Sequence, residues 1–200
     1  MAPRARRADL SGPATEVAPR LVGWSLVARA AEGLVRATIV ETEAYLPDDP
    51  ASHAFGGPTA RNRAMFERPG TLYVYLIYGL HHCCNVVTDR VGVGSAVLLR
   101  AAEPTEGIEL MRIRRPGVRD RDLCRGPGRL AAAFGIDRRL DGEDLVRGTT
   151  VWLERRETVG SVVTSTRVGI RAATEHPWRF SLAGSRWVSS PAPAASSLGR

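Results

Sequence analysis

The chain has 200 residues, the length of one domain, and 44% of them are apolar, which excludes a mainly disordered protein. No apolar run approaches the roughly 18 residues of a membrane helix, and no apolar stretch follows the first charged residues as in a secretory signal. Cys83 and Cys84 are adjacent and Cys124 stands alone, so the cysteines indicate no disulfide framework. We therefore expect a cytoplasmic protein that does not enter a membrane.

The charge of the chain indicates an acidic partner. Its 28 basic residues against 21 acidic ones give a net charge of +7, and all the basic residues are arginine. A positive surplus favours a polyanion such as nucleic acid, although the codon usage of a GC-rich genome explains abundant Arg, Ala, Gly and Pro equally well. The absence of lysine excludes covalent catalysis through a lysine Schiff base.

The two ends of the chain differ from its centre in composition. Residues 1–18 combine Pro, Arg, Ala, Ser and Gly without a period, which predicts a flexible N-terminal tail. Residues 191–200 are rich in Pro, Ala and Ser and predict a flexible C-terminal tail. We expect one continuous domain between them, at residues 19–190.

Within this domain, β-branched runs predict strands that cluster without strict alternation with helices. This pattern favours an α+β fold with a largely antiparallel sheet. Residues 46–71, rich in Pro, Gly, Asp and Asn, predict a long irregular segment of the kind that is usually functional. Strands are expected at 34–40 (continuing toward Tyr45), 71–78, 83–88, 95–101, 149–154, 165–171 and 179–182, and helices at 106–114 and 128–134.

The strands at 71–78 and 83–88 predict a hairpin that carries three of the four tyrosines. Tyr73 and Tyr75 share one face of it, because side chains alternate along a strand. Tyr78 lies near the tip, where a side chain can protrude. Two interpretations are open: an aromatic strand buried against the core, or a platform that stacks unpaired bases beside a wedge that enters a base stack.

Glu41, Glu43 and Tyr45 share one face of the strand that precedes the irregular segment. Two carboxylates on one face repel each other, so at least one of them needs a partner or solvent. A carboxylate in a partly dry aromatic pocket has a raised pKa and suits general-base catalysis. The spacing does not choose between the two glutamates, and it also fits two solvated residues at a sheet edge.

Two further clusters have less specific patterns. Asp48, Asp49 and His53 match no standard metal motif, but they leave a metal-dependent hydrolase as an alternative function. Residues 112–129 contain seven arginines against Asp120 and Asp122. This basic stretch is either a solvated face or a surface that contacts phosphates.

Eight blocks between about residue 20 and residue 190 resemble the alkyladenine (3-methyladenine) DNA glycosylase family. They occur in the family's order, and together they are far more specific than any one of them. The blocks are VETEAY at 40–45, ASH at 51–53, RNRAMF at 61–66, GTLYVYLIYG at 70–79, NVV at 85–87, AVLLRAAEP at 96–104, DLCRGPGRL at 122–130 and GSRWV at 184–188.

The resemblance implies roles for individual residues. Glu43 corresponds to the general base that activates the attacking water, and Arg100 to the residue that holds this water and a nearby phosphate. Side chains equivalent to Tyr45, His53 and Tyr75 enclose the flipped base in the family.

Two more roles follow from the hairpin blocks. Tyr78 corresponds to the wedge that fills the gap left in the duplex. Asn85 corresponds to a pocket residue that crowds out the amino group of normal guanine.

The resemblance also implies a fold and a function. The fold is a single mixed domain with a curved antiparallel sheet and a protruding hairpin, and it needs no metal or cofactor. The expected protein is a monomeric, nucleoid-associated, monofunctional DNA glycosylase. It binds double-stranded DNA, excises alkylated or deaminated purines by water attack and leaves an abasic site for base excision repair. The alternative on the same fold is a catalytically silent nucleic-acid-binding module.

The chain departs from the family pattern in two places. Residues 46–52 are one residue shorter than usual, which predicts a shifted His53 and an altered base preference. The return strand carries His82, Cys83 and Cys84, where members of the family often have an aromatic side chain. This difference predicts a changed support for the wedge.

Overall fold

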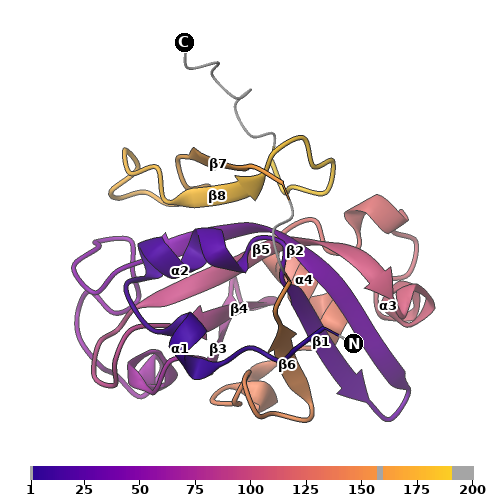
Figure 1. Cartoon of the computed structure of the whole chain (residues 1–200), viewed down its shortest axis with the longest axis horizontal. Coiled ribbons are helices and arrows are strands. Elements are labelled where there is room, and N and C mark those ends of the chain that lie inside the picture. The colour runs from indigo at the N-terminus through magenta and orange to yellow at the C-terminus, as the bar shows by residue number, and fades with distance from the viewer. Residues whose placement is uncertain (1, 157–159, 191–200) are drawn as a thin grey trace.

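The computed structural model describes residues 2–156 and 160–190 and shows helices packed on an antiparallel sheet (Figure 1). Hydrogen-bonded strands follow the order β3-β4-β5-β2-β1-β6, and β8 pairs with both β2 and β7. Every strand pair between named strands is antiparallel. The strands are β1 Ser25–Ala30, β2 Gly33–Tyr45, β3 Leu72–Ile77, β4 His81–Val87, β5 Ala96–Glu106, β6 Val151–Glu154, β7 Val162–Ser165 and β8 Arg179–Leu182.

The helices pack against this sheet and complete its main apolar core, and the predicted α+β class with a curved antiparallel sheet is confirmed. Among the described residues, no helix has the length and apolar character needed to cross a bilayer. The α-helices are α1 Arg7–Leu10, α2 Ala14–Leu21, α3 Ile108–Arg114 and α4 Pro127–Phe134, and 3₁₀ turns cover Arg63–Phe66, Asp120–Asp122 and Arg138–Leu140.

The flexible N-terminal tail predicted at residues 1–18 is wrong for the part that the structure describes, because α1 and α2 lie there. Ala14, Val17, Ala18 and Leu21 are all fully buried in the core. Their spacing of three, four and seven residues is that of the apolar face of a helix. This period was visible in the sequence but was masked by the surrounding Pro, Ala and Arg. The second predicted tail, 191–200, lies outside the described residues.

Most predicted strands are confirmed, but the one at 165–171 is wrong. Strand β7 ends at Ser165, and the chain then turns into a loop. The reason lies in Arg167, whose fully buried side chain contacts Asp49 on the loop after β2 and the Ala44 carbonyl of β2 instead of continuing the alternation of a strand. Strand β1 was not predicted at all, although it pairs with both β2 and β6.

Candidate active site

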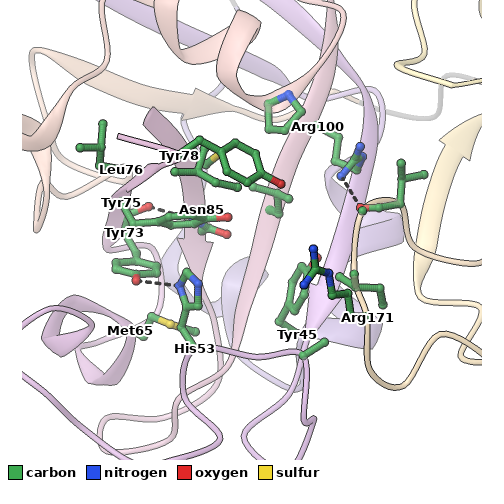
Figure 2. Close-up of a pocket in the computed structure, with 18 of the residues that line it drawn as sticks. Tyr45, His53, Met65, Tyr73, Tyr75, Leu76, Tyr78, Asn85, Arg100 and Arg171 are labelled. Carbon is green, nitrogen blue, oxygen red and sulfur yellow. Dashed lines mark hydrogen bonds between the residues drawn. The ribbon is translucent and has the colours of Figure 1, made fainter. Parts of the chain in front are cut away.

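A cavity of about 680 Å³ opens between the β3–β4 hairpin and two loops, the one after β2 and the one after β7. Figure 2 shows Tyr73, Tyr75 and His53 on one side of it and Tyr45 with Arg171 on the other. The other residues that line it include Arg61, Tyr78, Cys83, Asn85, Leu98, Arg100 and Val168. The cavity therefore brings together every residue singled out by the resemblance except Glu43.

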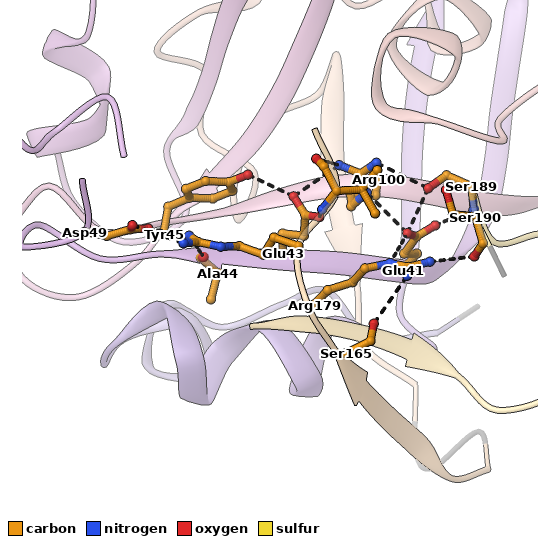
Figure 3. Close-up of polar contacts among 12 residues, drawn as sticks. Glu41, Glu43, Ala44, Tyr45, Asp49, Arg100, Ser165, Arg179, Ser189 and Ser190 are labelled. Atoms are coloured by element: carbon orange, nitrogen blue, oxygen red, sulfur yellow. Dashed lines mark hydrogen bonds and ion pairs between the residues drawn. The ribbon is translucent and has the colours of Figure 1, made fainter. Parts of the chain in front are cut away.

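Glu43 lies directly behind the wall of this cavity and has no exposed surface. Its carboxylate accepts hydrogen bonds from the Tyr45 hydroxyl at 2.9 Å, the Arg100 guanidinium at 3.1 Å and the Val168 N–H at 2.7 Å (Figure 3). All three donors line the cavity. Burial raises the pKa of Glu43 above its usual value, against the opposing effects of Arg100 and of the two other hydrogen bonds.

Arg100 reaches both glutamates of β2 because of an irregularity in the sheet. Glu41 pairs with Ala101 and the next residue of β2 with Leu99, so Arg100 has no opposite residue. Such a bulge re-aims a side chain. The Arg100 Nε lies 3.2 Å from Glu41 and its Nη1 lies 3.1 Å from Glu43. Burial opposes the charge of Arg100, but the two glutamates keep its pKa above the usual value.

Glu41 is as buried as Glu43 but has different partners. In addition to Arg100, it accepts hydrogen bonds from the Arg179 Nε at 2.6 Å and the Ser189 hydroxyl at 2.8 Å (Figure 3). Neither Arg179 nor Ser189 lines the cavity. The interpretation of both glutamates as solvated edge residues is therefore wrong. Of the two, the geometry favours Glu43 as the carboxylate that acts at the cavity, because its hydrogen-bond donors line it.

The aromatic side chains of the hairpin form one wall of the cavity. The rings of Tyr73 and Tyr75 stack with centroids 5.6 Å apart, and His53 meets Tyr75 edge-on at 4.4 Å. The His53 Nδ1 also lies 3.0 Å from the Tyr73 hydroxyl. Burial lowers the pKa of His53 and raises that of Tyr73 to about 12. All three side chains therefore present uncharged faces at neutral pH.

Asn85 and Tyr78 differ in their exposure on this hairpin. Asn85 is buried, and its side-chain amide donates to the Tyr73 carbonyl at 3.1 Å. Tyr78 is 82% exposed at the tip beside the equally prominent Leu80. Tyr78 and Gly79 have φ values of 54° and 68°, which suit a tight hairpin turn and are unusual for tyrosine.

The sequence analysis missed the loop after β7 as part of the site. Val168 contributes its backbone N–H to Glu43, and Arg167 anchors the loop through its ion pair with Asp49. Almost every residue type has a backbone N–H, so neither the identity nor the spacing of residues could have indicated Val168. The buried partner of Asp49 was equally hidden, because 118 positions separate the two residues.

The alternative of a metal-dependent hydrolase finds no set of ligands. Both carboxylate oxygens of Asp49 contact Arg167, and His53 is engaged with Tyr73. Over residues 2–156 and 160–190, no group of three or more His, Cys, Asp or Glu side chains is arranged to hold a metal ion.

The basic stretch at 112–129 forms ion pairs within itself. Arg112 lies 2.5 Å from Asp120, and Arg119 lies 2.8 Å from Asp122. Asp122 is also within 4.0 Å of three further arginines of the stretch. Because these two aspartates balance only two of the seven arginine charges, the stretch keeps a positive surplus, and contact with phosphates stays a prediction.

Comparison of the sequence with known proteins identifies one family. The family model for methylpurine-DNA glycosylase matches residues 8–186. A protein of Rubrobacter xylanophilus, provisionally named 3-methyladenine DNA glycosylase, is 48% identical over 167 residues, which are 83% of this chain and 87% of that protein. A Rhodopseudomonas palustris protein of the same name is 47% identical over 96% of this chain and 92% of its own length. The DNA-3-methyladenine glycosylase of Mus musculus is 47% identical over 88% of this chain and 58% of that protein.

Proposed function

Because this chain belongs to the methylpurine-DNA glycosylase family and is thus a DNA glycosylase of base excision repair, we propose that Glu43 directs water onto the sugar of a flipped, damaged purine nucleotide. One observation carries the proposal. The Glu43 carboxylate is buried behind the cavity wall and is bound by three donors that all line the cavity.

The substrate has to leave the duplex before it can reach this cavity. A base inside the helix cannot approach Glu43, and extrusion costs a few kcal/mol, least for a damaged or mispaired base. Tyr78 at the hairpin tip fills the gap, as apolar and aromatic wedges do in other duplexes.

Figure 2 shows Tyr45 on one side of the cavity and His53 with Tyr75 on the other, and we propose that the flipped base lies between them. Stacking on such rings contributes roughly 1–3 kcal/mol per base and tolerates many ring shapes. A methylated, cationic purine gains further from the tyrosine faces. Asn85 lies in the same cavity, where it opposes the amino group of normal guanine.

The chemistry needs one free position on the Glu43 carboxylate. A carboxylate accepts about four hydrogen bonds, and protein donors occupy three of these positions on Glu43, which leaves one. Because Glu43 has no exposed surface, a water reaches this position only when one of the donors that line the cavity shifts. The water oxygen bonds to the sugar carbon, its proton passes to Glu43, and the N-glycosidic bond breaks with its electron pair on the purine. The negative charge of Glu43 also stabilises the positive charge that develops on the sugar.

A single carboxylate suffices because alkylated purines are good leaving groups, unlike the sugars for which glycosidases use two carboxylates. The product is a free base and an abasic site in an intact strand, since the chain has no lysine for a Schiff base. Treatment with borohydride should trap no covalent complex through a side chain.

We also propose that the enzyme acts as a monomer on nucleoid DNA, without a metal or cofactor.

The test of the proposed function is Glu43→Gln. General-base catalysis contributes about 10²–10⁴-fold, so single-turnover excision from a hypoxanthine duplex should fall by at least this range. Binding of the same duplex in a gel shift should remain close to wild type, because the cavity walls are unchanged. An active variant would contradict the assignment, and a wild-type protein that binds without excising would support the silent binding module.

A further inference from the structure

A buried ion pair lies behind Tyr45, and the reaction described above does not use it. The side chains of Asp49 and Arg167 are fully buried. The Arg167 Nη1 contacts one carboxylate oxygen of Asp49, and its Nη2 lies 3.0 Å from the other. Arg167 also donates to the carbonyls of Ala44 at 3.0 Å and Ala173 at 3.2 Å. The pair therefore ties the loop after β2 to the loop after β7.

The Arg167 guanidinium lies over the ring of Tyr45, and we infer that it covers the face turned away from the cavity, because Tyr45 lines the cavity and the fully buried Arg167 does not. Its central carbon is 4.7 Å from the centroid of the ring. Tyr45 lines the cavity whereas Arg167 is buried behind it, and Figure 3 shows Asp49 close to the Tyr45 side chain. A base stacked on the cavity face would lie roughly 8 Å from the guanidinium, separated from it by a single ring.

We propose that Asp49, by neutralising Arg167 behind Tyr45, sets the preference of the cavity for cationic over neutral purines. This inference rests on the proposed stacking of the flipped base on Tyr45. Methylation at a ring nitrogen such as N7 of guanine makes the base cationic, whereas hypoxanthine is neutral. An unpaired cation on the far face of Tyr45 would repel a cationic base on the near face and leave a neutral base largely unaffected. The paired carboxylate cancels this repulsion and leaves the ring attractive to cations.

A purely structural role of the pair makes a different prediction. If Asp49 and Arg167 only held the two loops in place, their loss would reduce excision of cationic and neutral bases alike. The ratio of the two activities therefore separates the electrostatic role from the structural one. Intrinsic differences in leaving-group ability cancel when the ratio of each variant is divided by the wild-type ratio.

The experiment compares Asp49→Asn, Arg167→Gln and the double variant by single-turnover excision. The two substrates are a duplex with one 7-methylguanine, kept at a pH where this base is cationic, and the same duplex with one hypoxanthine. Asp49→Asn should lower the cationic-to-neutral ratio of specificity constants roughly tenfold, from the charge it leaves unpaired behind Tyr45. Arg167→Gln should raise the ratio, and the double variant should return it to within about twofold of wild type, because the net charge is again zero.

Glu154→Gln is the matched control. Glu154 is also buried and paired with an arginine, Arg36 at 2.6 Å, but it lies on β6, and its arginine is not the one that lies over the Tyr45 ring. It should lower the thermal stability and leave the ratio unchanged. If Asp49→Asn unfolds, the other two variants still test the inference, because Arg167→Gln should raise the ratio and the double variant should leave it near the wild-type value.

A ratio that stays constant in every folded variant of Asp49 and Arg167 would overturn the inference while leaving the proposed function intact. The proposed function itself fails in a different way, when wild-type protein excises neither base or when Glu43→Gln remains active.

Discussion

Glu41 and Glu43 lie two residues apart on the same strand, β2, are equally buried and both contact Arg100. Glu41 is surrounded by a second arginine and by Ser189, which satisfy its carboxylate away from the cavity. Glu43 has only neutral donors besides Arg100, and these donors line the cavity. The two glutamates therefore differ in their partners and not in their burial, and on the proposed assignment this difference separates the structural carboxylate from the reactive one.

The two environments have opposite consequences for stability. The charge of Glu41 is balanced by Arg179 in addition to the shared arginine. The raised pKa of Glu43 means that its ionised form is less favourable in the folded protein than in the unfolded chain. Ionised Glu43 therefore lowers stability at neutral pH, which is a common cost of a reactive group.

Glu41→Gln should produce the largest change in stability. It breaks a buried ion pair and leaves Arg179 without its carboxylate, which typically costs about 3–5 kcal/mol. The midpoint of thermal unfolding should fall by roughly 6–20 °C. Glu106→Gln is the control, because this glutamate pairs with Arg36 at the surface and should cost at most about 1 kcal/mol. Equal effects of the two substitutions would refute the structural role of Glu41.

Glu43→Gln should change stability in the other direction. Because the pKa of Glu43 is raised, the neutral amide avoids the cost of ionisation and should unfold at the wild-type temperature or above it at neutral pH. The difference from wild type should disappear as the pH falls and the wild-type carboxylate becomes protonated. Thermal unfolding of both proteins over a pH series measures this. A strongly destabilised variant would place Glu43 in the same class as Glu41.

Tyr78→Ser sharpens the contrast between the exposed tip and the buried centre. The side chain is 82% exposed, so its loss should change stability by less than about 0.5 kcal/mol. Capture of the flipped base should weaken by roughly tenfold, since the gap in the duplex is no longer filled. A fluorescent base analogue opposite the lesion would report this directly, and unchanged capture would count against the wedge.

Much of the site could be predicted because its residues lie in short local patterns. The tyrosines of the hairpin and the glutamates of β2 were found by strand alternation alone. Residue roles came from the resemblance, which covers nearly the whole chain. The structure adds that the residues named by both routes meet at one cavity.

What could not be predicted depends on contacts between distant segments. The spacing alone does not separate Glu41 from Glu43, and the partners that distinguish them in the structure are Arg179, Ser189 and Val168, which lie more than a hundred positions away. The orientation of Arg100 depends on a bulge whose register no local pattern encodes. The helices before residue 22 were not predicted, because Pro, Ala and Arg obscure the short apolar period of α2.

The most direct test of the account is the pH dependence of single-turnover excision of hypoxanthine by wild type and by Glu43→Gln. The general base acts when ionised, so the wild-type rate should be constant above the raised pKa of Glu43 and fall tenfold per pH unit below it. This acid limb should lie above the ordinary value of 4.5 and be absent from the residual activity of the variant. An acid limb that is the same in both proteins would show that another group activates the water.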